Sequence, residues 1–160
     1  RSRGLGDVYK RQFLTLLVEG QGENMRLLLC RRSPLKRLWG GVLADSCAGH
    51  PLPGEGVAAA TARRINEELG IMREPDELKH LGHVVYREDH GDGRCECEWC
   101  EVYLARVKPG ELHINQEEIS EVRRVALSEL DGYLQGHPEQ LAPWLREALS
   151  DPSIRTALAM

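Results

Sequence analysis

The chain has no apolar run long enough to span a membrane and no recognisable signal peptide. These absences predict a cytoplasmic protein with no membrane partner. Positive charge is also in deficit, because 21 Lys and Arg stand against 25 Asp and Glu, a formal net charge of −4. That balance argues against broad nucleic-acid binding, so an anionic ligand has to be held by a few local cations.

The sequence also lacks repeats, low-complexity segments and an even set of cysteines. Five cysteines, three of them within residues 95–100, do not form the pattern of a secreted disulfide framework. No second ligand pair stands at the spacing of a zinc knuckle, so we expect this cluster to pack in a half-buried strand. At 160 residues, 41% of them hydrophobic, the chain suits one globular domain with a core.

An initiator Met is missing, and residues 1–12, RSRGLGDVYKRQ, show no apolar period. GDVYKRQ resembles a translated sequencing adaptor or transposon end fused to an incomplete reading frame. We therefore expect residues 1–12 to be a non-native leader. Residues 13–160 are expected to form a single domain that is truncated at its amino terminus.

Apolar runs and turn signals predict an α/β fold, with a mixed β-sheet sandwiched by helices. Residues 13–18 and 25–30 flank a turn-forming segment and predict a hairpin. Further strands are expected at 41–48, 81–86, 98–105 and 121–126, with a polar loop at 90–93. Helices are expected near 127–134, 140–150 and 152–158.

One more helix is predicted over residues 57–69. Val57, Thr61, Ile65 and Leu69 recur every four residues and form an inward stripe, while charged residues occupy the rest of the wheel. Gly70 can adopt the left-handed conformation that ends a helix. Taken alone, this pattern is also that of an ordinary surface helix with i,i+4 ion pairs.

The spacing around this helix resembles the Nudix box, G-x5-E-x7-R-E-U-x-E-E-x-G-U, in which U is apolar. Residues 49–71 match the box at Gly49, Glu55, Arg63, Ile65, Glu67, Glu68, Gly70 and Ile71. The exception is Arg64, where the box has Glu. The resemblance implies a Nudix fold, whose helix carboxylates hold a divalent metal against a diphosphate.

Longer segments are similar to the type 1 isopentenyl-diphosphate isomerases, a branch of the Nudix superfamily. Residues 28–55, LLCRRSPLKRLWGGVLADSCAGHPLPGE, resemble that family's segment R-R-x4-K-x2-W-x-G-x-W-T-N-x-x-C-G-H-P-x-x-G-E, and an Arg at position 64 is also typical of the family. The likeness continues through residues 86–105 to Pro143 and Trp144. It implies an enzyme that interconverts isopentenyl and dimethylallyl diphosphate in isoprenoid biosynthesis.

The resemblance assigns metal ligands to four positions. Glu96 and Glu98 match a Glu-x-Glu strand whose carboxylates ligate a metal, and residues two apart on a strand share one face. His50 matches a metal-binding histidine, and Glu68 matches the helix carboxylate that holds Mg²⁺ beside the diphosphate. The implied cofactors are Mg²⁺ and a second divalent metal, Mn²⁺ or Zn²⁺.

It also assigns the substrate pocket. Arg32, Lys36 and Arg64 match basic residues near the phosphates, and Trp144 matches an aromatic residue that faces the carbocation. Each assignment has a plainer alternative. Two glutamates more often mark a solvated edge strand, a histidine more often bonds within a loop, and an isolated cation more often lies on the surface.

Isomerisation protonates an alkene and removes a proton elsewhere, so it needs proton carriers on opposite sides of the substrate. Glu98, with Tyr86 beside it, is expected on one side. The family uses a Cys immediately before Gly-His-Pro on the other, but this position is Ala48. Cys47 is expected on the opposite strand face unless a bulge intervenes. The family's other two metal-binding histidines lie upstream of the hairpin, and no His precedes His50.

Three functions stay open from the sequence. The first is an isomerase whose activity is in doubt because of Ala48. The second is a Nudix pyrophosphohydrolase of a small diphosphate, which Glu67 and Glu68 favour and Arg64 disfavours. The third is a non-catalytic prenyl-diphosphate binder, which Ala48 permits. The sequence does not predict an oligomeric state.

Overall fold

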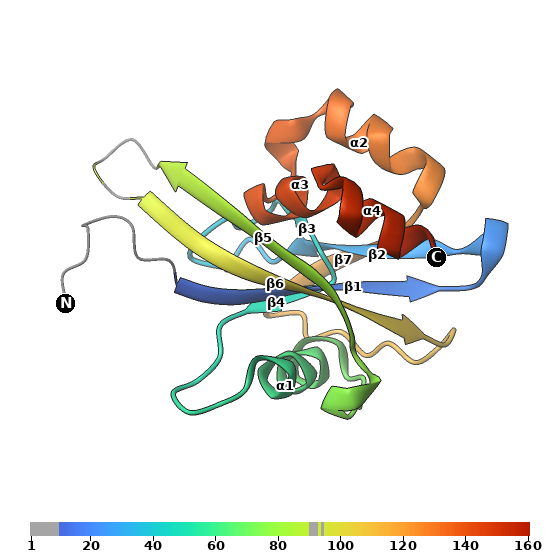
Figure 1. The fold of residues 1–160 in the computed structure, drawn as a ribbon, viewed down its shortest axis with the longest axis horizontal. Helices are drawn as coiled ribbons and strands as arrows, with labels where there is room; N and C mark the ends of the chain where they lie inside the picture. The colour runs from blue at the N-terminus through green and yellow to red at the C-terminus, as the bar shows by residue number, and fades with distance from the viewer. Residues whose placement is uncertain (1–9, 90–92, 94) are drawn as a thin grey trace.

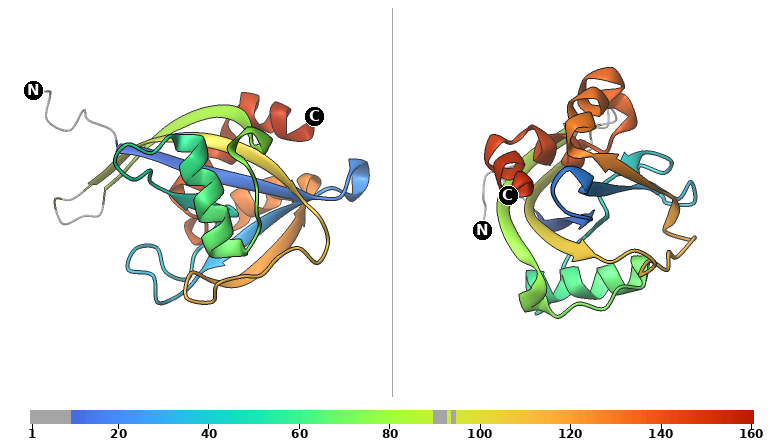
Figure 2. Two further views of the ribbon diagram at one scale, coloured as in Figure 1. Left: turned by 90° about the horizontal axis from the view of Figure 1, so that it is seen from below. Right: turned by 90° about the vertical axis from the view of Figure 1, so that its right-hand side faces the viewer.

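A computed structural model describes residues 10–89, 93 and 95–160. Helix α1 (Val57–Leu69) lies below a twisted β-sheet in Figure 1, and the other three helices lie above it. These are α2 (Leu130–Gly136), α3 (Pro143–Ser150) and α4 (Pro152–Ala159). The two further views show the same arrangement, with α1 and the α2–α4 group on opposite sides of the curved sheet (Figure 2). The predicted α/β sandwich is confirmed.

The sheet of the described residues has seven strands in a mixed arrangement. Its path is β3-β2-β1-β6-β5, with β4 paired to β1 and β7 paired to β2. Only the β1–β6 pair is parallel among these pairings. The strands are β1 (Lys10–Glu19), β2 (Arg26–Arg32), β3 (Leu43–Ala44), β4 (Cys47–Gly49), β5 (Lys79–Asp89), β6 (Cys95–Val107) and β7 (Ile119–Ala126).

One edge of β1 is shared by two strands, and we call this place the branch point of the sheet. Residues 13–15 of β1 pair with β4, whereas residues 17–19 pair with β2. Between them, Thr15 N donates to Asp45 Oδ2 (3.0 Å) and Leu17 N donates to Ser46 Oγ (2.9 Å). The prediction of one continuous strand over residues 41–48 is therefore wrong. Two side chains accept β1 N–H groups there, and the segment divides into β3 and β4.

The other elements lie close to their predicted places. The hairpin forms as β1 and β2, and the remaining expected strands lie within β5, β6 and β7. Helix α1 has the predicted bounds and ends at Gly70, whose φ is 70°. The segment expected as a helix at 127–134 begins with the 3-10 turn Leu127–Glu129 and continues as α2. The segment expected as a helix at 140–150 becomes helical only at Pro143, the start of α3, after the 3-10 turn Pro138–Gln140. Three of the four residues of the expected polar loop, 90–92, lie outside the described residues.

Strand β1 begins three residues before the expected domain boundary at residue 13. Lys10, Arg11 and Gln12 continue the parallel ladder with β6, where Lys10 faces Glu98. The rest of the expected leader lies outside the described residues. The boundary therefore shifts to include residues 10–12, and a non-native origin for residues 1–12 stays a prediction.

Two apolar clusters occupy opposite faces of the sheet. Leu17 packs with Ile65 and Leu69 on the α1 side, and its neighbour Leu16 packs with Leu145 on the α3 side. All five cysteines are free thiols, and the three on β6 range from exposed to buried, as expected for half-buried strand packing. Within the described residues, every helix is too short or too polar to cross a bilayer.

Candidate functional site

A pocket of about 370 Å³ collects residues from six elements and the loops between them. Its floor includes Ala48 and Gly49 of β4, and Trp39 and Leu38 come from the loop between β2 and β3. Six of the residues predicted for the site line this one pocket: Arg32, Lys36, His50, Arg64, Glu96 and Trp144. They are separated by up to 112 positions in the sequence, since 144 minus 32 is 112. The fold therefore brings the predicted constellation together.

Glu98 and Tyr86 adjoin the pocket at its acidic end. His50 Nε2 lies 3.1 Å from Glu98 Oε1, and the Glu98 side chain is only 3% exposed. Tyr86 is the cross-strand partner of Glu98 in the β5–β6 ladder. Burial, together with the nearby carboxylates of Glu96 and Glu98, raises the pKa of Tyr86. The expected pairing of Glu98 with Tyr86 is therefore present in the geometry.

The acidic end satisfies some requirements of a cation site. Among the described residues, Glu98 Oε2 is a buried oxygen without a hydrogen-bond partner, and Glu98 Oε1 already contacts the His50 ring. Glu96 lines the same pocket and accepts a bond from Trp39 Nε1 (3.0 Å). Within the described part of the chain, no three His, Cys, Asp or Glu side chains are grouped as metal ligands. The donor set suits a divalent ion, but a complete cage is not present.

Aromatic rings form the side of the pocket next to this acidic end. The Trp144 ring centroid lies 6.2 Å from that of Tyr86 and 6.4 Å from that of Trp39. The Arg32 guanidinium carbon lies 5.4 Å from the Trp144 ring centroid. Electron-rich ring faces attract cations, so this wall can stabilise positive charge in a bound molecule.

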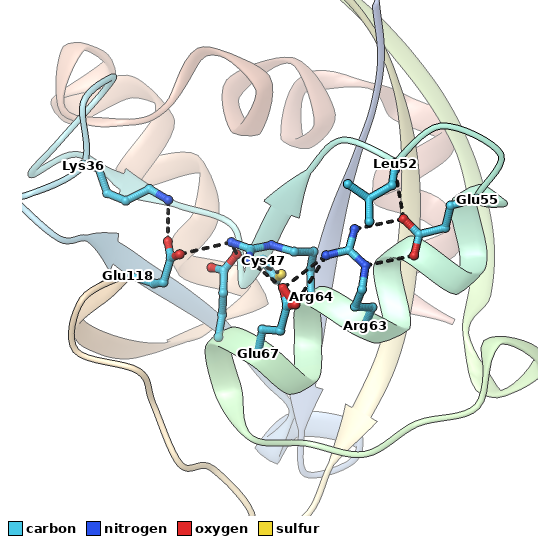
Figure 3. A network of polar contacts seen from close by, with 9 residues as sticks. Lys36, Cys47, Leu52, Glu55, Arg63, Arg64, Glu67 and Glu118 are labelled. Carbon is cyan, nitrogen blue, oxygen red and sulfur yellow. Dashed lines mark hydrogen bonds and ion pairs between the residues drawn. The ribbon is translucent and has the colours of Figure 1, made fainter.

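Lys36 and Arg64 lie in a network with carboxylates from α1 and from the loop before β7 (Figure 3). Arg64 donates to Glu67 Oε1 (2.7 Å), to Glu68 Oε2 (2.6 Å) and to Glu118 Oε1 (3.3 Å). Lys36 forms an ion pair with the same Glu118. Both cations are thus held at the pocket by Glu118, which joins a loop residue to a helix residue.

Glu68 lies behind the pocket rather than in its lining. Its side chain is 10% exposed, and its Oε2 lies 3.5 Å from the Cys47 sulfur. Burial raises the pKa of Glu68 to about 7, although Arg64 acts in the opposite direction. Burial likewise raises the pKa of the Cys47 thiol. The predicted Mg²⁺ ligand therefore contacts Arg64 of the pocket lining but does not itself line the pocket.

Ala48 and Cys47 present their side chains to opposite faces of the sheet. Ala48 lines the pocket and packs against the α3-side cluster, whereas Cys47 belongs to the α1-side cluster. The β1–β4 register runs without a shift through both residues. The expected facing of Cys47 away from the pocket is confirmed, and the alternative of a bulge at this point is wrong.

Comparisons with known proteins agree with this geometry. The NUDIX domain family matches residues 8–150 of the chain. Isopentenyl-diphosphate Delta-isomerase of Paenarthrobacter aurescens is 37% identical over 148 residues, covering 92% of this chain and 77% of that protein. The isomerase of Nocardia farcinica is 36% identical over 140 residues, covering 87% and 76%. The chain belongs to the isopentenyl-diphosphate isomerase family of Nudix proteins.

Solved structures support the fold of this isomerase-family protein. A MutT protein from Methanosarcina mazei superposes with a TM-score of 0.66 at 23% identity, covering 89% of this chain and 91% of that one. A NUDIX hydrolase from Alicyclobacillus acidocaldarius gives 0.66 at 14% identity, covering 98% of each chain. At these identities the likeness concerns the Nudix fold alone.

Sequence reasoning assigned no role to three residues that line or support this pocket: Asp45, Trp39 and Glu118. Asp45 stands where the family pattern has Asn, so this departure was the available signal. Trp39 stands at the Trp of the family pattern K-x2-W, which was the available signal, and it is the one non-glycine residue with a positive φ (58°) in the described chain. Glu118 lies in a polar segment without a motif, and only the fold places it between Lys36 and Arg64.

Proposed function

We propose that this protein interconverts isopentenyl diphosphate and dimethylallyl diphosphate in isoprenoid biosynthesis. The observation that supports this most is the composition of one pocket. Cations occupy one part, an aromatic wall occupies another, and the His50–Glu98 pair with Tyr86 lies beside that wall. A diphosphate with a short hydrocarbon tail matches these three chemistries, and the names of the relatives give the same substrate class.

We assign roles to the residues as follows. Arg32, Lys36 and Arg64 bind the diphosphate through charge-assisted hydrogen bonds. Glu98, with Tyr86, carries a proton on one side of the five-carbon unit. Trp144 faces the cationic intermediate with its ring. Opposite Glu98, Ala48 offers only a methyl group, so we expect slow turnover.

Divalent metals belong to this proposal. His50, Glu96 and Glu98 would hold one ion, Mn²⁺ or Zn²⁺, and Glu68 would hold Mg²⁺ near the phosphates. Such ions neutralise carboxylate and diphosphate charge. The unpartnered Glu98 Oε2 and the contact of Glu98 Oε1 with His50 support the first site. The second site rests on the family resemblance, and Mg²⁺ there would replace Arg64 as the partner of Glu68 Oε2. We also propose a cytoplasmic location, which the five free thiols support.

A hydrolase receives less support from the geometry. The two helix carboxylates that would bind catalytic metal, Glu67 and Glu68, are both bonded to Arg64. Arg63 also donates to Glu67 at 3.1 Å. Glu67 is thus paired with two guanidinium groups, and Arg64 replaces a glutamate of the box, so a hydrolytic metal site would have one carboxylate fewer.

Product analysis tests the function directly. The purified protein is incubated with isopentenyl diphosphate, Mg²⁺ and Mn²⁺, and the products are separated. We expect the parent to form the allylic isomer and the Glu98→Gln variant to form none. Released phosphate or diphosphate would indicate a hydrolase, and tight binding without turnover would indicate a binding protein.

A further inference from the structure

Asp45 connects the aromatic wall of the pocket to the branch point of the sheet. Its side chain is 2% exposed and accepts three hydrogen bonds from N–H groups. Trp144 Nε1 donates to Oδ1 at 2.8 Å, while Thr15 N and Cys47 N donate to Oδ2 at 3.0 and 3.1 Å. One carboxylate thus joins α3, β1 and β4, which are far apart in the sequence.

These bonds fix the two sides of the pocket relative to each other. The indole N–H of Trp144 points to Asp45, so the orientation of the ring is set by Oδ1. The second oxygen holds the backbone at Cys47, one residue before the Ala48 that lines the pocket. The position of the ring relative to β4 therefore depends on one side chain.

The donor set explains why Asp suits this position. All three partners are N–H donors, which an ionised carboxylate can accept with both oxygens. An Asn has one acceptor oxygen, so its NH₂ group would face a donor at either Trp144 or the β1–β4 backbone. Burial raises the pKa of Asp45, and the bonds from Trp144 and Thr15 act in the opposite direction.

We propose that Asp45 is a positioning residue that holds the Trp144 ring against the cationic intermediate, a role that rests on the proposed isomerase function. Asp45 acts through Trp144 and does not line the pocket itself. An anionic acceptor at the indole N–H also increases the electron density of the ring, which strengthens its attraction for a cation. The residue should therefore matter more to the cationic intermediate than to the binding of the substrate, whose hydrocarbon part is uncharged.

The bond itself is tested by NMR, independently of any turnover. The chain has three indole N–H groups, and the Trp144 signal is the one that Trp144→Phe removes. A bond to a carboxylate shifts an indole proton downfield, so Asp45→Asn should move this signal upfield. Asp151→Asn is the matched control, because Asp151 also accepts backbone N–H bonds, from Ser153 and Ile154. It should leave the Trp144 signal in place.

The role is tested with two probes and a double-mutant cycle. One probe is an alkyl diphosphate with a tertiary ammonium group at the position of the intermediate's cation, and the other is its uncharged isostere. Asp45→Asn should reduce the preference for the ammonium probe roughly ten-fold, with little change for the isostere. Trp144→Phe keeps an aromatic ring in the wall but removes the N–H, so it cuts the same bond without removing the Asp45 bonds to Thr15 N and Cys47 N. In the Trp144→Phe background, Asp45→Asn should cause little further loss of the preference for the ammonium probe.

The outcomes separate this inference from the proposed function. An unchanged Trp144 indole signal in Asp45→Asn overturns the inference. So does a loss of preference for the ammonium probe on Asp45→Asn that is equal in the parent and in Trp144→Phe. If the parent isomerises isopentenyl diphosphate, Asp45→Asn and Trp144→Phe should each lower kcat with little effect on KM. A raised KM with little change in kcat also overturns the inference. If the parent forms no allylic isomer but the signal and the probe preference change as expected, the proposed function fails. The assignment of Asp45 to Trp144 then stands.

Discussion

Position 48 presents a methyl group to the pocket, while the adjacent thiol of Cys47 lies among buried side chains next to Glu68. We expect Ala48→Cys to raise the rate of isomer formation by about 100- to 10,000-fold, the usual contribution of a general acid or base. Cys47→Ser is the control and should leave the rate of the parent unchanged. A rate in Ala48→Cys equal to that of the parent would show that another component of the site is missing.

Arg63 and Arg64 are neighbours on α1 with different surroundings. Arg64 lines the pocket, whereas Arg63 bonds Glu55 and Glu67 outside it. Arg64→Gln should weaken the binding of inorganic diphosphate roughly ten-fold or more at low salt, because a charge-assisted bond is lost. Arg63→Gln is the matched control and should leave this affinity unchanged. Calorimetric titration of the two variants with diphosphate checks the prediction. Equal affinity in the two variants would remove Arg64 from the phosphate site.

At the scale of elements, the end of α1 depends on a glycine. Gly70 has φ 70°, and a Cβ there would lie 2.8 Å from His113 Cβ and 2.9 Å from His113 O. Gly70→Ala should therefore lower the free energy of unfolding by about 1–3 kcal/mol. Gly56 at the other end of the helix has open space around it, so Gly56→Ala is the matched control. Urea unfolding compares them, and equal losses would contradict the steric argument.

An ion pair joins the loop after α1 to the turn after β6. Arg73 donates to both oxygens of Glu111 at 2.7 and 2.9 Å, and Lys108 N donates at 2.8 Å. These bonds lower the pKa of Glu111 from 4.5 to about 2. A carboxyl group with a lowered pKa in the folded state stabilises the fold above pH 4.5 and loses that contribution as the pH falls towards 2.

Glu111→Gln should therefore be less stable than the parent by about 1 kcal/mol at neutral pH. The difference should shrink below pH 4.5 and vanish only below pH 2, where Glu111 of the folded parent is also protonated. Urea unfolding at several pH values measures it. A difference that is constant across this range would show that the ion pair is not its origin.

At the scale of the whole molecule, one sheet serves two cores. Leu16 and Leu17 are adjacent on β1, are fully buried and belong to opposite clusters. Each Leu→Ala change should lower the free energy of unfolding by about 2–5 kcal/mol. Because both clusters share β1, each variant should keep a single transition by fluorescence and by circular dichroism. Separate transitions in either variant would show that the two faces unfold independently.

Local patterns predicted much of this molecule. The stripe of Val57, Thr61, Ile65 and Leu69 gave the bounds of α1, because a helix is determined by contacts within a few residues. The branch point could not be predicted, since it depends on Asp45 and Ser46 bonding to a strand thirty positions earlier (45 minus 15). For the site, motif positions identified the pocket lining. They missed Glu118 and Asp45, which act through contacts that only the folded chain creates.

The branch point also bears on how this site can change in evolution. Asp45 and Ser46 attach the start of β4 to β1 through side chains, so they fix which residues of β4 face the pocket. Two point substitutions can exchange the residues at 47 and 48 without disturbing those bonds. Deleting one codon between Ser46 and Gly49 would instead turn every following side chain of the strand over. A lineage can therefore lose or regain a pocket thiol by substitution far more readily than by a change in length.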